Sequence, residues 1–370
     1  MLSRRRTPAM GWNSWNAFRC YDANETAILA QADQLINLGL AEAGYDTVVV
    51  DDCWQAPTRG RDGELRACPE RFPSGMAALG QEIRSRGLRF GLYLAPGRRT
   101  CAQIWDAYGI RRCGCPLDRL RATLARLDPR ASRSEDLGSW AREQEDLEQV
   151  LSWGVEYLKY DWCQGSVNTG SPGRLWRDAL DPVEAFTHMS ALIDAAEQEV
   201  HFSISEYGKY EPWRWAPRIA NSWRTTGDIQ PSATSIFRIA RATERVAWST
   251  RPGRICDPDM LQIGNLPGSR AFPDDRDPRA TLDYAHMAMW AMLAAPLMIG
   301  TDLRGLTPES LPVRVLTDAR LLALNQDPLV EAGRIVADGP GGTLWRRRTA
   351  AGTVTLTVRR GRSYPTGARA

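Results

Sequence analysis

Carboxylates follow several short apolar runs of the chain, and two neighbouring carboxylates can cleave a glycosidic bond. One acid attacks the anomeric carbon or activates water, while the other protonates the leaving oxygen. Six of the apolar runs end in ionisable or aromatic groups: Asp51 and Asp52, Tyr93, Lys159 and Asp161, Glu206, Arg224 and Asp228, and Asp257 and Asp259. Packing alone does not require such groups at so many places, so we interpret them as parts of one site.

Other reactive side chains are scarce, which favours carboxylate chemistry. The chain has three histidines, His188, His201 and His286, at unrelated spacings. A histidine metal site or a serine–histidine relay is therefore a poor expectation. Cys113 and Cys115 are too close together for a zinc knuckle of the CxxC type. We expect neither a metal nor a cofactor.

Tryptophans lie beside the acids in the sequence, at positions 12, 15, 54, 162 and 223. Their flat aromatic faces suit sugar rings. Tryptophan is also largely buried on average, so packing in the core or at a barrel rim explains each of them equally well. Both interpretations stay open for every one of the five.

Composition excludes several classes of protein. The 370 residues are 43% hydrophobic and 25% charged, which is typical of a globular chain. A net charge of +3 gives no reason to expect a nucleic acid or an acidic membrane surface as partner. Two lysines, Lys159 and Lys209, stand against 45 arginines. This ratio indicates a GC-rich, bacterial genome and makes each remaining lysine notable.

Eight short β-rich runs alternate with amphipathic helical stretches. The runs span residues 9–15, 45–52, 89–95, 156–163, 201–207, 221–229, 254–263 and 297–303, and the helical stretches span 25–40, 75–86, 140–153, 182–200, 232–248, 280–295 and 308–324. Eight such units predict a parallel (β/α)8 barrel, in which the strand ends converge on one face. A doubly wound sheet is the alternative, but no G-x-G-x-x-G follows the first run.

The pattern changes near the end of the chain. We expect a catalytic barrel over residues 1–328 and the start of an incomplete antiparallel β domain over residues 329–370, with strands at 343–348 and 353–359. The polar, arginine-rich stretch 102–139 predicts an insertion. The apolar run 284–300 contains His286 and Pro296 and is too short for a membrane span, so we expect a buried helix and strand there.

Five motifs, in order, resemble glycoside hydrolase family 27, the α-galactosidase or melibiase family of retaining enzymes. They are MGWNSW (10–15), DDCW (51–54), YLKYDWC (157–163), WRTTGDI (223–229) and DPDML (257–261). The resemblance covers roughly residues 7–330. It implies a (β/α)8 barrel followed by an antiparallel β domain, and an enzyme that releases terminal α-linked D-galactose without a cofactor.

The resemblance also implies roles for individual residues. Asp161 would be the nucleophile, Asp228 the acid/base, and Lys159 a ligand of sugar hydroxyls that keeps nearby acids ionised. Asp51 and Asp52 would bind the 4- and 6-hydroxyls of galactose, and Trp15 would form an apolar wall. Tyr93, Arg224 and Asp259 would complete the pocket, and Glu206 would favour a sugar with a free 2-hydroxyl.

The same resemblance pairs Cys20 with Cys53 and Cys101 with Cys163, whereas free buried thiols are the alternative. No secretion signal is visible, because the stretch after Arg4–Arg6 is short and polar. We therefore expect a cytoplasmic protein, or a secreted one if the cysteines form disulfides.

Two segments depart from the family pattern. SEYG (205–208) stands where the family often has CEWG, and LAPG (94–97) stands where SDAG is usual, which removes an acid at Ala95. Together with the insertion 102–139, these changes bear on which sugar is bound. The alternatives are β-L-arabinopyranosidase, isomalto-dextranase or α-N-acetylgalactosaminidase activity, or a non-catalytic carbohydrate-binding barrel.

Overall fold

A computed structural model describes residues 1–105, 136–163, 180–265 and 278–359. Eight parallel strands form one sheet in the order β7-β6-β5-β4-β3-β2-β1-β8. Their bounds are β1 Met10–Asn13, β2 Thr47–Val50, β3 Arg89–Leu94, β4 Val155–Asp161, β5 His201–Ser205, β6 Ser222–Arg224, β7 Ile255–Asp257 and β8 Leu297–Ile299. A parallel bridge between Leu261 and Ile299 joins the segment after β7 to β8 and closes the ring. The predicted barrel and all eight strands are confirmed.

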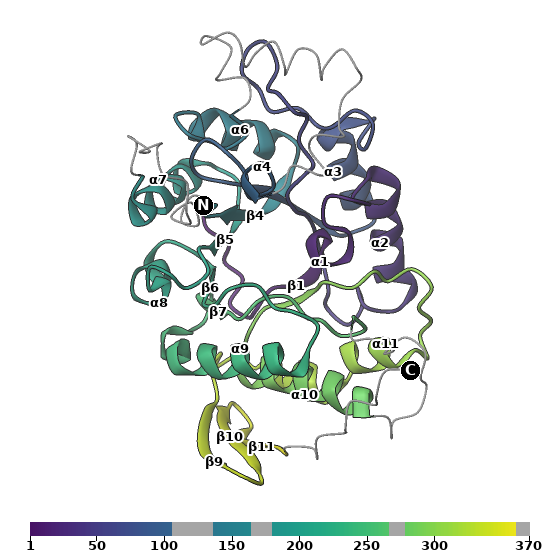
Figure 1. Cartoon of the computed structure of the whole chain (residues 1–370), viewed down its shortest axis with the longest axis vertical. Coiled ribbons are helices and arrows are strands. Elements are labelled where there is room, and N and C mark those ends of the chain that lie inside the picture. Colours follow the sequence, from purple (N-terminus) through teal and green to yellow (C-terminus); the bar gives the residue numbers. More distant parts are fainter. Residues whose placement is uncertain (106–135, 164–179, 266–277, 360–370) are drawn as a thin grey trace, which may run out of the picture.

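Helices surround this ring of strands (Figure 1). They are α1 Ser14–Phe18, α2 Glu25–Asn37, α3 Gly75–Ser85, α4 Cys101–Trp105, α6 Glu143–Ser152, α7 Pro182–Ala195, α8 Pro212–Trp215, α9 Ala233–Val246, α10 Pro278–Met292, α11 Leu311–Leu316 and α12 Ala319–Asn325, with 3-10 turns at η4 Ala216–Arg218 and η5 Ala247–Ser249. The short α1, α4 and α8 were not expected. Among the helices of the described residues, none combines the length and the apolar character that a membrane crossing needs.

Several helices, among them α2, α7, α9 and α12, begin at a side chain that caps them. Asp181 accepts a hydrogen bond from the Glu184 amide at 3.0 Å, and Pro182 occupies the first turn of α7, where its missing N–H costs nothing. The expected helix 308–324 is two helices. Asp318 caps α12 by accepting from the amides of Arg320 and Leu321, so the chain restarts a helix there instead of continuing α11.

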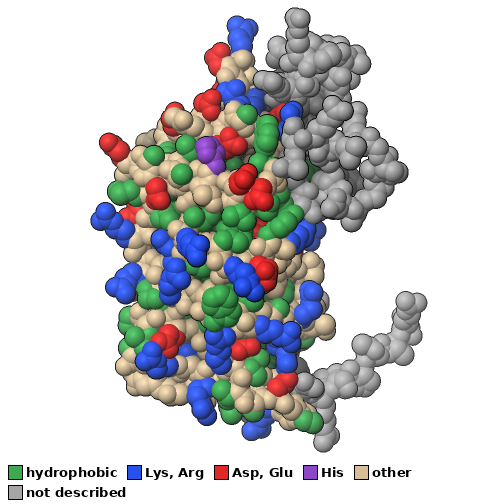
Figure 2. Space-filling view, turned by 90° about the vertical axis from the view of Figure 1, so that its left-hand side faces the viewer, with side chains coloured by type: hydrophobic (Ala, Val, Ile, Leu, Met, Phe, Trp, Pro, Cys, Tyr) green, Lys and Arg blue, Asp and Glu red, His purple; other side chains and the backbone are tan. Residues whose placement is uncertain are grey.

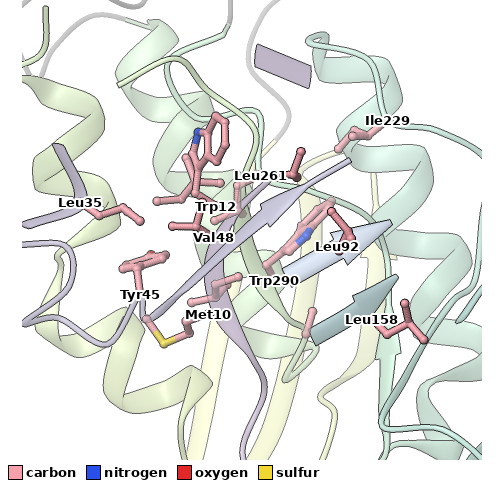
Figure 3. Close-up of a cluster of buried hydrophobic side chains, with 14 of the residues drawn as sticks. Met10, Trp12, Leu35, Tyr45, Val48, Leu92, Leu158, Ile229, Leu261 and Trp290 are labelled. Atoms are coloured by element: carbon pink, nitrogen blue, oxygen red, sulfur yellow. The ribbon is translucent and has the colours of Figure 1, made fainter. Parts of the chain in front are cut away.

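The core lies between the strand ring and the helices. Its side chains come from both layers, as Figure 3 shows for Met10, Trp12, Val48, Leu92, Leu158, Tyr45, Leu35 and Trp290. In α9, residues 236, 239, 240 and 243 are buried at helical spacing, which turns one face of this helix to the ring. Burial of this kind fixes the strand ends in place.

A second sheet follows the barrel. It is antiparallel, with the order β11-β10-β9 and bounds β9 Arg334–Gly339, β10 Gly342–Thr349 and β11 Gly352–Val358. It lies beside α9 and α10 (Figure 1), where Trp345 is buried and the Arg347 guanidinium donates to the Ala291 carbonyl near the end of α10. β10 and β11 match the expected strands, and β9 was missed. The division proposed at residue 328 falls between α12 and β9.

Candidate active site

A cavity of about 570 Å³ opens at the carboxyl ends of the barrel strands. Eight of the ten predicted catalytic and sugar-binding residues line it: Trp15, Asp51, Asp52, Lys159, Asp161, Arg224, Asp228 and Asp259. They come from α1 and from the ends of β2, β4, β6 and β7. The barrel thus brings together residues that lie more than 200 positions apart, at the face where barrel enzymes place their sites.

Lys159 and Asp51 form an ion pair on the floor of this cavity. Lys159 Nζ lies 2.7 Å from Asp51 Oδ2, and Asn13 Nδ2 donates to the same oxygen at 2.7 Å. Burial alone would lower the pKa of Lys159, but the charges of Asp51 and Asp161 outweigh it and raise this pKa above its usual value. The lysine therefore keeps its positive charge at neutral pH.

Asp161 is the last residue of β4 and is almost completely buried. Its carboxylate accepts a hydrogen bond from the Tyr207 hydroxyl, and Oδ1 has no partner among the described residues. Burial raises the pKa of Asp161, the charge of Lys159 lowers it, and the charges of Asp51 and Asp228 raise it again. The result is a pKa above the usual aspartate value, in a carboxylate with one oxygen left for another ligand.

Asp228 and Asp259 share one arginine. Arg224 Nη2 lies 3.2 Å from Asp228 Oδ1 and 2.9 Å from Asp259 Oδ2. The Asp228 side chain is 54% exposed, whereas that of Asp259 is 4% exposed. The Asp228 carboxylate is therefore open to solvent, while Asp259 holds the arginine in place. Burial raises the pKa of Asp259, and Arg224 lowers it.

Asp52 lines the cavity but also ties two loops together. Its oxygens accept hydrogen bonds from the amides of Cys53 at 2.7 Å and of Ala102 at 2.8 Å. Burial raises the pKa of Asp52 to about 6, although both amides favour the ionised form. The Ala102 contact fixes the start of α4 against the end of β2, on one side of the cavity.

Tyr93 and Glu206 are fully buried and do not line the cavity. The Tyr93 hydroxyl is 3.1 Å from Cys163 Sγ and accepts from the Cys101 amide. Glu206 Oε2 accepts from the Tyr210 amide at 2.8 Å, and burial raises the pKa of Glu206 to about 7. Both side chains are placed to support the residues that line the cavity.

Comparisons with known proteins show the family of the chain. The family described as Alpha galactosidase A matches residues 7–112 and 134–327. The chain belongs to this family. It is 36% identical to Alpha-galactosidase 3 of Arabidopsis thaliana over 90% of the chain and 34% identical to Alpha-galactosidase 2 of the same plant over 93%. It spans 64% and 74% of their lengths, respectively.

A solved structure shows the same likeness in three dimensions. The α-galactosidase of Saccharomyces cerevisiae in its structure with raffinose superposes with a TM-score of 0.71 at 25% identity, over 95% of this chain and 74% of that one. The likeness extends over the barrel and the β sheet that follows it. The family to which the chain belongs is a family of glycoside hydrolases.

Two disulfides brace the active face of this family member, as the resemblance implies. Cys20 is bonded to Cys53, and Cys101 is bonded to Cys163. Cys101, Asp161 and Cys163 are grouped closely enough for a metal, but both sulfurs are used by the disulfide. Cys68 is also disulfide-bonded, Cys256 is a free buried thiol, and Cys113 and Cys115 lie outside the described residues.

Of the five tryptophans that lie near acids in the sequence, four belong to the core and one lines the active-site cavity. Trp12, Trp54 and Trp223 are fully buried, Trp162 is nearly so, and Trp15 alone among the five is partly exposed at the cavity. Trp12 and Trp54 donate their indole N–H groups to the carbonyls of Thr301 and Tyr93, as buried tryptophans commonly do. Core packing is therefore the correct interpretation for four of them.

Tyr207 is a site residue that was not predicted from the sequence. It lines the cavity, contacts Asp161 and lies under the guanidinium of Arg224, which is 5.7 Å from its ring centroid. Its φ of 66° is strained for a tyrosine, and Asp259, with φ 107°, is strained in the same cavity. Tyr207 lies two residues after the end of β5, and this position at a strand end was the sequence feature that could have identified it.

Proposed function

We propose that the protein hydrolyses terminal α-linked D-galactose with retention of configuration. The observation that carries the proposal is the pair of unlike carboxylates in one cavity, buried Asp161 and solvent-facing Asp228. Retaining glycosidases need one carboxylate that bonds to the sugar and one that exchanges protons. Membership of the α-galactosidase family supports the choice of sugar.

In the first step, a carboxylate oxygen of Asp161 attacks the anomeric carbon, and the bond from this carbon to the leaving oxygen breaks. Asp228 donates its proton to that oxygen, so the aglycone leaves as an alcohol. The product is a galactosyl ester of Asp161. Lys159 stays charged beside the site and stabilises the Asp161 carboxylate before attack and after its release.

In the second step, Asp228 takes a proton from a water molecule, and the water oxygen attacks the anomeric carbon. The ester bond breaks, galactose leaves, and Asp161 returns to its carboxylate form. The Asp228 side chain suits this exchange because more than half of its surface is open to solvent. Two inversions give net retention.

Binding of galactose is assigned to the remaining lining residues. Asp51, held by Lys159 and Asn13, and Asp52 accept hydrogen bonds from the 4- and 6-hydroxyls, and Trp15 covers the apolar face of the ring. Arg224 and Asp259 bind near the 2-hydroxyl. Tyr93 and Glu206 act indirectly, through the Cys101–Cys163 disulfide and the loop at Tyr210.

The deciding experiment measures hydrolysis of an aryl α-D-galactoside. Aryl β-L-arabinopyranoside, aryl α-N-acetylgalactosaminide and an isomaltoside are tested in parallel as alternative substrates. Asp161→Asn serves as the blank. Preference for the α-galactoside supports the proposal. If only one of the other glycosides is cleaved, the two-carboxylate mechanism still holds, but the substrate is that glycoside and not an α-galactoside. A folded protein that cleaves none of them contradicts the proposal.

A further inference from the structure

We propose a second carbohydrate-binding site, for a neutral saccharide unit, in a cavity beside the active site. The cavity has a volume of about 420 Å³ and lies among residues 59–63, 98 and 136–142. The inference rests on the proposed function, because it assigns the second site to the oligosaccharide substrates of the same enzyme. Nothing in the catalytic mechanism above uses these residues.

Residues of one segment, 98–102, line both cavities. Arg98 lines the second cavity, while Cys101 and Ala102, a few residues further on, line the first. The other wall of the second cavity is the turn at residues 60–63, in the segment between β2 and α3. Segments that follow β2 and β3 therefore contribute to both cavities, on the catalytic face of the barrel.

The floor of the second cavity is rigid because Arg59 ties its walls together. The guanidinium of Arg59 donates to both oxygens of Asp146 at 2.6 Å and to the carbonyls of Gly63, Asp136 and Gly138. Arg59 and Asp146 are both buried. A bidentate buried pair of this kind fixes the backbone around it, as a preformed binding site requires.

Close backbone contacts also shape the walls. The amides of Gly138 and Trp140 donate to the carbonyls of Arg98 and Gly97. A Cβ on Gly138 would lie 2.2 Å from the Gly97 carbonyl oxygen, so only glycine permits this approach. Ala141, next to the tryptophan, has a φ of 56°, and such strain in a non-glycine residue concentrates at functional sites.

The lining has the chemistry of a site for a neutral polyol. Trp140 is half-buried and offers an aromatic surface for a sugar ring. The charge of Arg59 is balanced by Asp146, and Arg98 lies 3.5 Å from Asp136. Such pairs offer donors and acceptors side by side, which suits adjacent hydroxyls. Arg61 and Arg142, which form no ion pair among the described residues, add guanidinium donors for further hydroxyl oxygens.

Calorimetric titration of Asp161→Asn tests the inference without turnover. Galactose is titrated first, and raffinose or stachyose is then titrated with galactose present at saturation, so that the catalytic cavity is filled. We expect the oligosaccharide still to bind, and Trp140→Ala in this background to weaken that binding about tenfold or more. Trp140→Phe should restore most of it, and Trp248→Ala, at an exposed tryptophan in η5, is the matched control.

Arg61→Ala provides a second variant, at an exposed side chain of the lining. We expect weaker oligosaccharide binding with an unchanged melting temperature. Absence of oligosaccharide binding beside galactose, or equal binding by the Trp140→Ala and Trp248→Ala variants, overturns the inference. Failure of galactose itself to bind contradicts the proposed function instead, while the Trp140 comparison still reports on the second cavity.

Discussion

Lys159 Nζ and Asp51 Oδ2 lie 2.7 Å apart although their strands, β4 and β2, are separated by β3. Contact across an intervening strand is what the interior of an eight-stranded barrel permits, because side chains from alternate strands share one layer. Arg224, at the end of β6, continues the same alternation. The ion pair is therefore a product of the barrel's layering, and it places a fixed positive charge beside Asp161.

The two lysines of the chain provide a direct comparison. Lys159→Ala leaves Asp51 buried without its cation, and loss of one partner of a buried pair costs about 3–5 kcal/mol. We expect kcat/KM for aryl α-galactoside to fall by about 100-fold or more, together with the melting temperature. Lys209→Ala, at the rim of the same cavity, is the control and should change kcat/KM much less. An equal decrease in kcat/KM in the two variants would show that Lys159 has no special role in the reaction.

The pH profile should show a raised acid limb. Asp161 must be ionised to attack, so activity falls as the pH drops through its pKa, which burial raises above the usual value of about 3.9. Lys159 lowers this pKa, so Lys159→Met should move the acid limb of kcat/KM to higher pH. The measurement is kcat/KM from pH 3 to 8. An acid limb that stays in place in Lys159→Met would show that the limb belongs to another group.

The two catalytic assignments predict different kinetic signatures. Asp161→Asn removes the nucleophile and should lower kcat about 1,000-fold or more for every leaving group, with an unchanged circular dichroism spectrum. Asp228→Ala removes the proton donor, so it should slow aryl galactosides with acidic phenols least and raffinose most. If Asp161→Asn kept substantial activity, Asp161 would not be the nucleophile. If the effect of Asp228→Ala did not depend on the leaving group, Asp228 would not be the proton donor.

The barrel and most of the site could be predicted from sequence because their signals are local. Each strand is a short apolar run, and the polar residue that ends it is carried to one face whatever the loop lengths. Tyr93 shows the limit of this argument. It lies on a strand like the others, but its hydroxyl contacts the Cys101–Cys163 disulfide in the wall of the cavity, and only the packing reveals that.

Features that depend on distant partners could not be predicted. Arg59 and Asp146 lie 87 positions apart, and no pattern in the sequence connects them. Strand β9 is largely exposed and contains an acid and a glycine, so it lacks the alternation of apolar and polar residues that marks β11. The break between α11 and α12 depends on one capping side chain, Asp318, in an otherwise continuous helical pattern.

Glu206 makes stability depend on pH. Its pKa is about 7 in the folded protein and 4.5 as an ordinary glutamate, so the neutral form favours folding. This contribution is fully present below pH 4.5 and is lost as the pH rises through about 7. Glu206→Gln should therefore be more stable relative to wild type at pH 8 than at pH 5, by roughly 2–3 kcal/mol.

Urea denaturation at the two pH values measures this difference. Glu199→Gln is the control with the opposite sign, because the Arg4 amide and the Ser3 hydroxyl lower the pKa of the exposed Glu199. Its contribution is present at neutral pH and disappears in acid. If Glu206→Gln and wild type lost stability in parallel between pH 5 and pH 8, Glu206 would be ionised throughout that range in the folded protein.

Removing one partner of the Arg59–Asp146 pair should lower the free energy of unfolding strongly, whereas replacing both partners should lower it less. Arg59→Met leaves Asp146 buried and unpaired, along with three backbone carbonyls that Arg59 now satisfies, so we expect a loss of about 3–5 kcal/mol in the free energy of unfolding. Adding Asp146→Leu removes the buried charge and should recover part of that loss. Urea denaturation of the two single variants and the double variant gives the coupling energy. A double variant as unstable as the sum of the single ones would mean that the pair contributes through its separate backbone contacts and not through mutual attraction.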